Sequence, residues 1–452
     1  MHFSANPPKC ERRGLWWSVD KAPTLCDNTG YSYRHAYINR VSALAHTTKT
    51  KNTVVVVILA YAIFIVLGIP SGLLGVAWPS MSQDFARPLD ALGILLLAST
   101  LGYLLASFFN GRVIARLGIA NTLIASTLLA SIGMLGYAVT QNWWLIIPVA
   151  TFTGLGNGTI DAGLNLHFAR HYSPRLMNWL HAAFGVGAVI GPIVMTTLIS
   201  QELSWRWGYA LMAVLQLLGS ISVLLTRARW DIPTPLETDE AKPKVKDYSL
   251  LQSLRQPLVL MGAALFFVYA GIEITAGQWT YSLFTEGRGI DISTAGLWVS
   301  IYWATFTLGR IVFGFIADRI PLAPTIRLCM LAVIVGTLMM LNTSGQTMTF
   351  IGLAIVGFAL APIFPLLISA TPDRLGEAHA TNAIGFQVAA AGLGIGVMPG
   401  LAGVLASSFG LEAIVPYLII VSVFMLVLYQ IIATRKIKRE DELAVPLVSP
   451  EF

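Results

Sequence analysis

Charged residues are scarce in this sequence, since Asp, Glu, Lys and Arg together make up 12% of its 452 residues. Soluble domains carry about 25% charged residues, because their surfaces face water. A chain with half of that charge cannot coat a water-soluble body of this size. Its hydrophobic fraction of 55% and mean hydropathy of +0.69 indicate a surface that faces lipid.

Cysteine is also rare. Cys10 and Cys26 lie in a polar stretch and Cys329 in an apolar one, so no disulfide framework is predicted. No spacing of His, Cys, Asp or Glu is typical of a metal site, and no nucleophile–base pair appears in the apolar segments. We therefore expect no metal, no cofactor and no catalytic residues, which argues against an intramembrane enzyme.

Long apolar runs are abundant. A helix that crosses ~30 Å of hydrocarbon needs about 20 apolar residues. This window predicts an all-α membrane protein with twelve transmembrane helices, near residues 53–78, 91–110, 118–140, 144–168, 177–200, 207–226, 257–284, 293–314, 324–342, 349–370, 379–405 and 412–434.

The apolar runs fall into two groups of six, at 52–226 and 257–434, joined by a charged linker at 227–256. Residues 435–452 form a basic C-terminal tail. Residues 1–51 are polar and lack the apolar core of a signal peptide, which predicts a cytoplasmic tail. A wrongly assigned start codon would explain this stretch equally well.

The positive charges are distributed unevenly among the loops. Of 29 Lys and Arg residues, only Arg87, Arg206 and Arg288 fall in the loops on one side of the predicted membrane. The positive-inside rule places the other loops, the linker and both termini in the cytoplasm. We expect a multi-pass protein of the cell membrane. Its net charge of +6 reflects this topology and does not indicate nucleic-acid binding.

The two groups of helices resemble each other at an offset of 203 residues. Gly111–Arg116 pairs with Gly314–Arg319 at corresponding loops, and Gly154 pairs with Gly357 in corresponding helices. Several matches at one offset favour a duplicated six-helix unit.

One of these loops reads Gly314-Phe-Ile-Ala-Asp318-Arg319, which resembles the signature loop Gly-x-x-x-Asp-Arg of the major facilitator superfamily. The first loop keeps Gly111 and Arg116 but has Ala115 where the family usually has Asp. Glycine permits close backbone approach, and Asp and Arg at helix ends can pair between halves, so these residues would serve a conformational switch. The resemblance implies two pseudo-symmetric halves with a solute site between them.

Four patches resemble the fucose permease branch of proton-coupled sugar permeases. They are the runs Gly154–Asn165, Met177–Gly187, Tyr269–Glu273 and Gly385–Gln387. The resemblance implies proton-linked sugar uptake. That branch also has an acidic residue in the first span, which is missing here: the corresponding stretch reads Gly68-Ile69-Pro70-Ser71-Gly72.

A rival resemblance lies in the fifth span. Gly187-Ala-Val-Ile-Gly191-Pro192 is similar to the Gly-x-x-x-Gly-Pro motif of drug/proton antiporters, although the trailing glycine pair is missing. The simpler interpretation is that small residues allow two helices to pack closely.

Two of the 23 acidic residues, Asp161 and Glu273, lie well inside predicted spans. An acid at the centre of a membrane helix costs ~2.5–3.5 kcal/mol on insertion scales, so such residues are usually functional. Because low dielectric favours the neutral form of a carboxylate, we expect both to be proton-coupling residues. The alternative is a buried pair that fixes helix register.

Amide and aromatic side chains suit a sugar's hydroxyl groups and C–H faces. The expected solute-binding residues are Asn165, Asn178, Gln278, Trp279, Tyr302 and Gln387. Asn165 follows Asp161 by four residues, which places both on one helical face. Each of the six, taken alone, is more often a helix–helix contact.

The sequence thus predicts a secondary transporter for proton-coupled uptake of a sugar or similar small polar solute. Its expected partners are the solute, protons and the lipid bilayer, with no oligomer required. A proton-driven antiporter that exports drugs or metabolites is the alternative. A transporter-derived sensor is disfavoured because no signalling domain is appended.

Overall fold

The computed structural model describes residues 30–230, 250–316, 319–343, 346–375 and 377–435. The chain forms two units, residues 1–54 and 55–452, each considered by itself. In the second unit, every regular element in the described residues is a helix.

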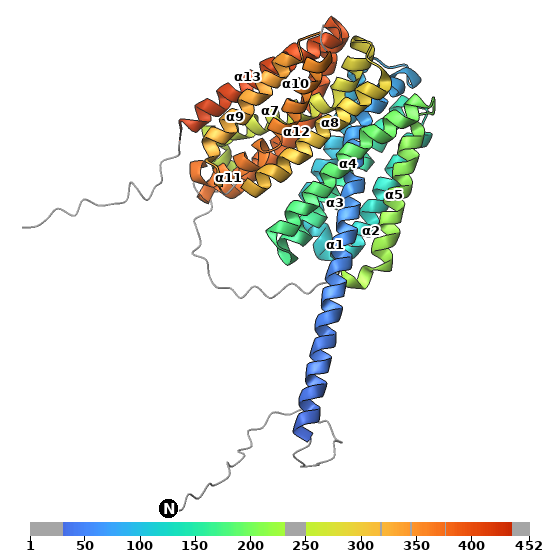
Figure 1. The fold of residues 1–452 in the computed structure, drawn as a ribbon, viewed down its shortest axis with the longest axis vertical. Coiled ribbons are helices and arrows are strands. Elements are labelled where there is room, and N and C mark those ends of the chain that lie inside the picture. The colour runs from blue at the N-terminus through green and yellow to red at the C-terminus, as the bar shows by residue number, and fades with distance from the viewer. Residues whose placement is uncertain (1–29, 231–249, 317–318, 344–345, 376, 436–452) are drawn as a thin grey trace, which may run out of the picture. The chain divides into compact units, whose positions relative to one another are not determined.

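The N-terminal helices precede residue 231, and their residues from 55 onward lie together in Figure 1. They are α1 Gly30–Asp84, η1 Leu89–Ala91, α2 Leu92–Val139, α3 Trp143–His171, α4 Pro174–Ser200, α5 Arg206–Leu225 and η2 Arg227–Arg229.

The C-terminal helices form a second group in the same view (Figure 1). They are α6 Leu250–Leu254, α7 Pro257–Ser282, η3 Leu283–Gly287, α8 Ile292–Ile316, α9 Leu322–Met339, α10 Gln346–Leu360, α11 Ile363–Leu375, α12 Glu377–Phe409, η5 Leu411–Ala413 and α13 Ile414–Ala433.

Within the described ranges, ten helices are long and apolar enough to cross a membrane. One of them, α2, joins two predicted spans and is broken at Gly118, whose φ of 76° and ψ of 164° are not helical. Glycine adopts this positive φ without the steric cost that a side chain would impose. The 29-residue α3 is long enough to cross but is not one of the ten.

Many serine and threonine side chains in these helices donate local hydrogen bonds, whereas Thr196, Thr275, Ser282 and Ser422 have no hydrogen-bond partner among the described residues. Thr127 donates to the carbonyl of Leu123 at 2.6 Å, and Thr280 donates to that of Ala276 at 2.7 Å. A buried hydroxyl without a partner would be costly in hydrocarbon. Large apolar side chains such as Phe108 and Phe315 are exposed instead, which is the pattern of a surface that faces lipid.

Close helix crossings depend on glycine. A methyl group added at Gly68 of α1 would lie 2.0 Å from the Phe184 carbonyl oxygen of α4. One added at Gly187 would lie 2.0 Å from the Ile65 oxygen, and one at Gly191 would lie 2.3 Å from the Ile69 oxygen. The packing interpretation of the Gly187–Pro192 motif is therefore confirmed.

The N-terminal and C-terminal helices meet tightly at one end, which we call the distal end; the linker end is the one where α5 finishes. Close approaches at the distal end join α2 to α12, α4 to α8 and α1 to α7. A methyl group at Gly93 would lie 2.6 Å from the Gly400 Cα, and one at Gly296 would lie 1.9 Å from the Thr196 hydroxyl.

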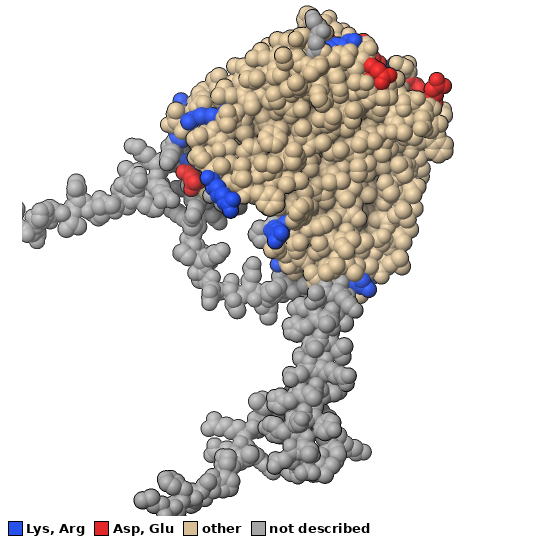
Figure 2. All heavy atoms as spheres, in the orientation of Figure 1, with Lys and Arg blue, Asp and Glu red and all other residues tan. Residues whose placement is uncertain are grey.

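The linker end is open, as the space around its glycines shows. An added methyl group at Gly111, Gly314 or Gly385 would meet no atom within 4 Å. The expectation that Gly111 and Gly314 permit close backbone approach is therefore wrong for this conformation, because the two groups of helices separate here. Figure 2 shows the surface notched at this end, with Lys and Arg side chains at the rim and an uncharged belt between the two ends.

Candidate functional site

Asp161 is held by neutral donors on α2 and α3. The Tyr103 hydroxyl of α2 donates to one of its carboxylate oxygens, and the Asn165 amide donates to the other at 3.0 Å. All three side chains are partly buried. Asn165 reaches the carboxylate because residues four apart in a helix share a face. No ion pair within 4.0 Å involves Asp161 in the described residues. Its charge is therefore stabilised by dipoles alone.

Glu273 occupies a different environment on α7. Its carboxylate interacts with the Tyr269 hydroxyl one helical turn away and with the Arg310 guanidinium of α8. The Tyr302 hydroxyl of α8 donates to the Glu273 main-chain oxygen at 2.7 Å, which ties the two helices together at this level. A cation and a carboxylate thus share one region inside the bundle.

Arg310 connects this region to α4. Its guanidinium lies 4.5 Å from the centre of the Phe306 ring, a cation–π distance. It also interacts electrostatically with His181 of α4. The His181 ring in turn meets Phe64 of α1 edge-on, with 6.1 Å between ring centres. Arg310 of α8 therefore interacts with groups on α4 and α7, and His181 in turn contacts α1.

The expected solute-binding residues are not gathered in one place. Asn165 lies beside Asp161, and Asn178 is exposed near the linker end of α4. Gln278 donates to the Ser71 carbonyl of α1 at 2.9 Å, and the fully buried Trp279 donates to the Pro399 carbonyl of α12 at 2.8 Å.

Two further members of the set lie inside the C-terminal helices. Tyr302 is fully buried beside Glu273, and Gln387 accepts a hydrogen bond from Thr371 at 3.1 Å. Together with Gln278 and Trp279 they form helix–helix contacts in this conformation. Contact of these residues with a solute stays a prediction.

The expected switch residues lie at the open linker end. Arg116 and Arg319 are exposed, and neither takes part in an ion pair within the described ranges. Asp318 lies outside the described residues. Neither Arg116 nor Arg319 therefore pairs with a described acidic residue across the two groups of helices, and their role in switching stays a prediction.

Sequence reasoning missed Tyr103 and Arg310 as partners of the two acids. Arg310 carried a usable signal, because a cation inside a predicted span is as costly as a carboxylate. Tyr103 carried none, since its pairing with Asp161 joins residues 58 positions apart. No group of three or more His, Cys, Asp or Glu side chains in the described residues is placed to hold a metal ion.

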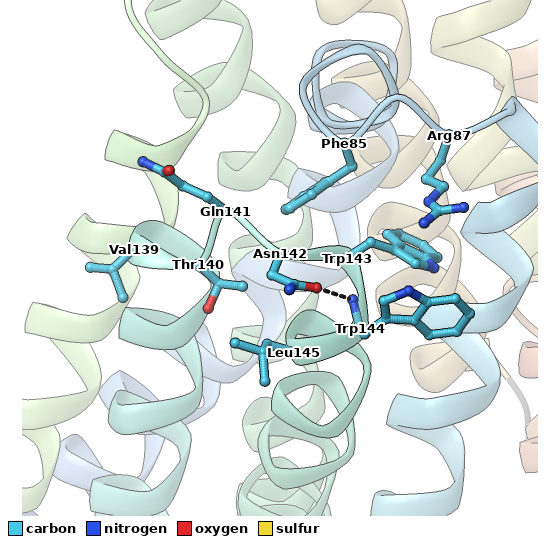
Figure 3. Close-up of a pocket in the computed structure, with 9 residues that line it drawn as sticks. All are labelled: Phe85, Arg87, Val139, Thr140, Gln141, Asn142, Trp143, Trp144 and Leu145. Carbon is cyan, nitrogen blue, oxygen red and sulfur yellow. Dashed lines mark hydrogen bonds between the residues drawn. The ribbon is translucent and has the colours of Figure 1, made fainter.

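The structure also has a cavity of about 640 Å³ at the distal end (Figure 3). There the Arg87 guanidinium lies 5.7 Å and 5.5 Å from the rings of Trp143 and Trp144, and Asn142 caps α3 through the Trp144 amide at 2.9 Å. Asp161 follows Trp143 by 18 residues on α3, or about 27 Å at 1.5 Å per residue. This cavity is therefore separate from the region of the acids.

Comparisons with known proteins agree with this architecture. The family model of the Major Facilitator Superfamily matches residues 60–291 and 261–448. The chain is 23% identical over 434 residues to sodium-dependent glucose transporter 1A of Mus musculus, covering 86% of this chain and 99% of that protein. It is 21% identical over 313 residues to the glucose/mannose transporter GlcP of Bacillus subtilis (strain 168), covering 68% and 78%.

Another relative is bypass of stop codon protein 6 of Saccharomyces cerevisiae, 23% identical over 425 residues, covering 85% of this chain and 84% of that protein. Among solved structures, a bacterial homologue of the human lysosomal transporter Spinster, in an inward-facing and unoccupied conformation, superposes with a TM-score of 0.66. It is 13% identical and the match covers 86% of this chain and 98% of that one, which shows the fold alone. The family match spans most of the chain, so this multi-pass membrane protein belongs to the major facilitator superfamily of transporters.

Proposed function

We propose that the protein takes up a sugar or similar small polar solute, coupled to protons, by alternating access. The observation that carries the proposal is Asp161, a half-buried carboxylate inside the bundle whose partners are neutral hydrogen-bond donors. The relatives named as glucose and glucose/mannose transporters support a sugar-like solute.

We propose an architecture of twelve transmembrane helices in two halves, 52–226 and 257–434, with a cytoplasmic linker at 227–256 and cytoplasmic tails at 1–51 and 435–452. Counting α2 as two crossings on either side of Gly118 and adding α3 to the apolar helices supports the number. The contacts of α2 with α12 and of α4 with α8 support the symmetry. In a six-plus-six repeat these are the second with the eleventh span and the fifth with the eighth, pairs that a two-fold axis exchanges.

The hydrogen bonds of Asp161 suggest how a proton could change the structure. While ionised, the carboxylate accepts from both Tyr103 and Asn165, an arrangement that favours its charged form. A protonated carboxyl is itself a donor, so one of these two donors must then turn away or reverse its role. Because Tyr103 belongs to α2 and Asp161 to α3, proton uptake would loosen a contact between helices.

Asn165 and Asn178 are the expected solute contacts nearest the open linker end. Near the closed distal end, Gln278 joins α7 to α1 through Ser71, and Trp279 joins α7 to α12 through Pro399. We propose that these two reach the solute when the distal end opens, with Tyr302 and Gln387 lining the route from the C-terminal side. Gly111, Arg116, Gly314, Asp318 and Arg319 would then form the switch at the linker end.

Sodium is the alternative coupling ion, because the name of the mouse relative specifies sodium dependence. Sodium binding needs several oxygen ligands around one cation. The Glu273 region opposes this, because Arg310 already supplies positive charge there. The Asp161 region offers three side chains, Asp161, Tyr103 and Asn165, and a proton needs only the carboxylate.

The test is solute accumulation in proteoliposomes of the purified full-length protein, using radiolabelled hexoses. An inward pH gradient should drive accumulation, whereas an inward sodium gradient at equal pH should not. Accumulation driven by sodium alone would overturn the choice of ion. Proton movement opposite to the solute would establish the antiport alternative.

A further inference from the structure

Arg310 is a cation inside a helix long and apolar enough to cross a membrane, and no described acidic side chain lies within ion-pair distance of it. The described residues contain two ion pairs, Arg206 with Asp84 and Arg288 with Glu412, and both lie at the distal end. Arg310 also makes no hydrogen bond to the described residues. An arginine inside a membrane span is energetically costly and is usually functional. Its five N–H donors are therefore candidates for binding a ligand.

The Arg310 side chain is only partly buried, and none of its nitrogens is among the buried polar atoms that lack a partner. The guanidinium packs over the Phe306 ring, whose centre lies 4.5 Å from the guanidinium carbon. A guanidinium held against an aromatic ring keeps its fork of N–H donors free for a planar carboxylate, which it can bind bidentately.

The titratable groups that interact with Arg310 come from three helices. Glu273 and Tyr269 lie on α7, Tyr302 on its own helix α8, and His181 on α4. Glu273 is the single carboxylate of the set, and it is not within ion-pair distance of the guanidinium. The two groups are therefore neutral in sum without forming an ion pair within 4.0 Å.

We propose that Arg310 binds an acidic group on the solute, so that the transported solutes are sugar acids or similar polyols that carry a carboxylate. This inference rests on the proposed uptake of a polar solute and narrows its chemistry. If Arg310 recognised only hydroxyl groups, no anion on the solute would compensate its charge when the site closes around the solute. The desolvation cost of that charge would then be high.

Proton and anion binding then support each other. An ionised Glu273 partly satisfies the charge of Arg310 and repels an incoming carboxylate, whereas a protonated Glu273 leaves the cation free. Anion binding must in turn favour the protonated state of Glu273 to the same extent. The empty site contains one carboxylate and one guanidinium and has no net charge. The loaded site gains one proton and one anion, so its net charge is the same. Neither state has to move an uncompensated charge through the bilayer.

The experiment compares matched pairs of solute: glucose with gluconate, galactose with galactonate and mannose with mannonate. Binding to the full-length protein in nanodiscs is measured by calorimetry at pH 5.5 and 7.5. At least one acid should bind the wild type more tightly than its parent hexose, and more tightly at pH 5.5. Arg310→Gln should weaken binding of that acid by roughly tenfold or more, the equivalent of a lost charged hydrogen bond. Glu273→Gln should remove the pH dependence.

Arg112→Gln is the matched control, because the Arg112 guanidinium also lies over a phenylalanine ring, that of Phe108 at 5.8 Å, but its side chain is exposed. It should bind the acid as the wild type does. Arg310→Lys tests folding, since it keeps the charge and should retain part of the affinity. Hexose binding without binding of any acid would overturn this inference and leave sugar uptake standing. An unchanged affinity in Arg310→Gln would also overturn it. A protein that neither binds nor accumulates any of the six solutes contradicts the proposed uptake itself.

Discussion

The two acids inside the bundle differ in what surrounds them. Asp161 on α3 receives hydrogen bonds from a tyrosine and an amide, and no cation pairs with it in the described residues. Glu273 on α7 interacts with a guanidinium on the neighbouring helix. A carboxylate held by neutral donors changes the net charge of its site when it takes up a proton. A carboxylate beside a cation instead decides whether that cation is free for another anion.

The largest effect should come from removing the charge of Asp161. Asp161→Asn mimics the permanently protonated residue, so it should still exchange solute across the membrane but should lose uphill accumulation completely. Counterflow and gradient-driven uptake in the same proteoliposomes separate the two activities. Glu273→Gln should retain some accumulation and weaken affinity for a neutral sugar, because its carboxylate can accept sugar hydroxyls. If both variants accumulate solute like the wild type, the two acids are structural.

The next effect concerns the charge pair. Arg310→Gln leaves Glu273 without its cation in a low-dielectric region and should lower the melting temperature. The double variant Arg310→Gln/Glu273→Gln should recover part of that loss, with a coupling of about 1 kcal/mol or more in a double-mutant cycle. Asp161→Asn combined with Arg310→Gln provides the control cycle and should be additive. Additivity in both cycles would show that Glu273 and Arg310 are energetically independent.

A smaller effect should result from loss of the tyrosine donor. Tyr103→Phe removes one hydrogen bond to ionised Asp161, a change of about 1 kcal/mol, and therefore favours the protonated residue. The pH dependence of uptake should move to higher pH by up to about one unit, with maximal rate reduced only modestly. Tyr302→Phe is a suitable comparison, because its hydroxyl bonds the main chain of Glu273 and not a carboxylate. An unchanged pH profile in Tyr103→Phe would contradict the proposed role of this hydrogen bond.

Much of the fold was predictable from composition, because runs of about 20 apolar residues can satisfy their backbone in lipid only as helices. The membrane-protein class and the superfamily were predicted correctly on that basis and on the Gly314–Arg319 loop. The break at Gly118 lies at the start of the predicted span 118–140, so the boundary between these two spans was predicted, but the backbone geometry of the break could not be anticipated from hydropathy.

The site was predictable only in part. The positions of Asp161 and Glu273 were visible in the sequence because charge inside a span is rare. Their partners were not, since Tyr103 and Arg310 come from other helices and their proximity depends on packing. Trp279 shows the opposite limit: its indole suits a sugar face, yet here it donates to the Pro399 carbonyl and is fully buried. An aromatic residue inside a span gives no sign of which role it has in a given conformation.

The smallest effect is expected at Asn165, where it can separate two roles. The Asn165 amide donates to Asp161 at 3.0 Å from the same helix, so Asn165→Ala removes a weaker, neutral donor and leaves Tyr103 in place. If Asn165 only orients the carboxylate, the pH profile should shift by less than in Tyr103→Phe and the KM for solute should change less than about threefold, which corresponds to about 0.65 kcal/mol. If it also binds solute, KM should rise while the pH profile keeps its position. Transport measured across the pH range at several solute concentrations distinguishes the two. A pH shift larger than that of Tyr103→Phe would contradict the assignment of the tyrosine as the principal donor to Asp161.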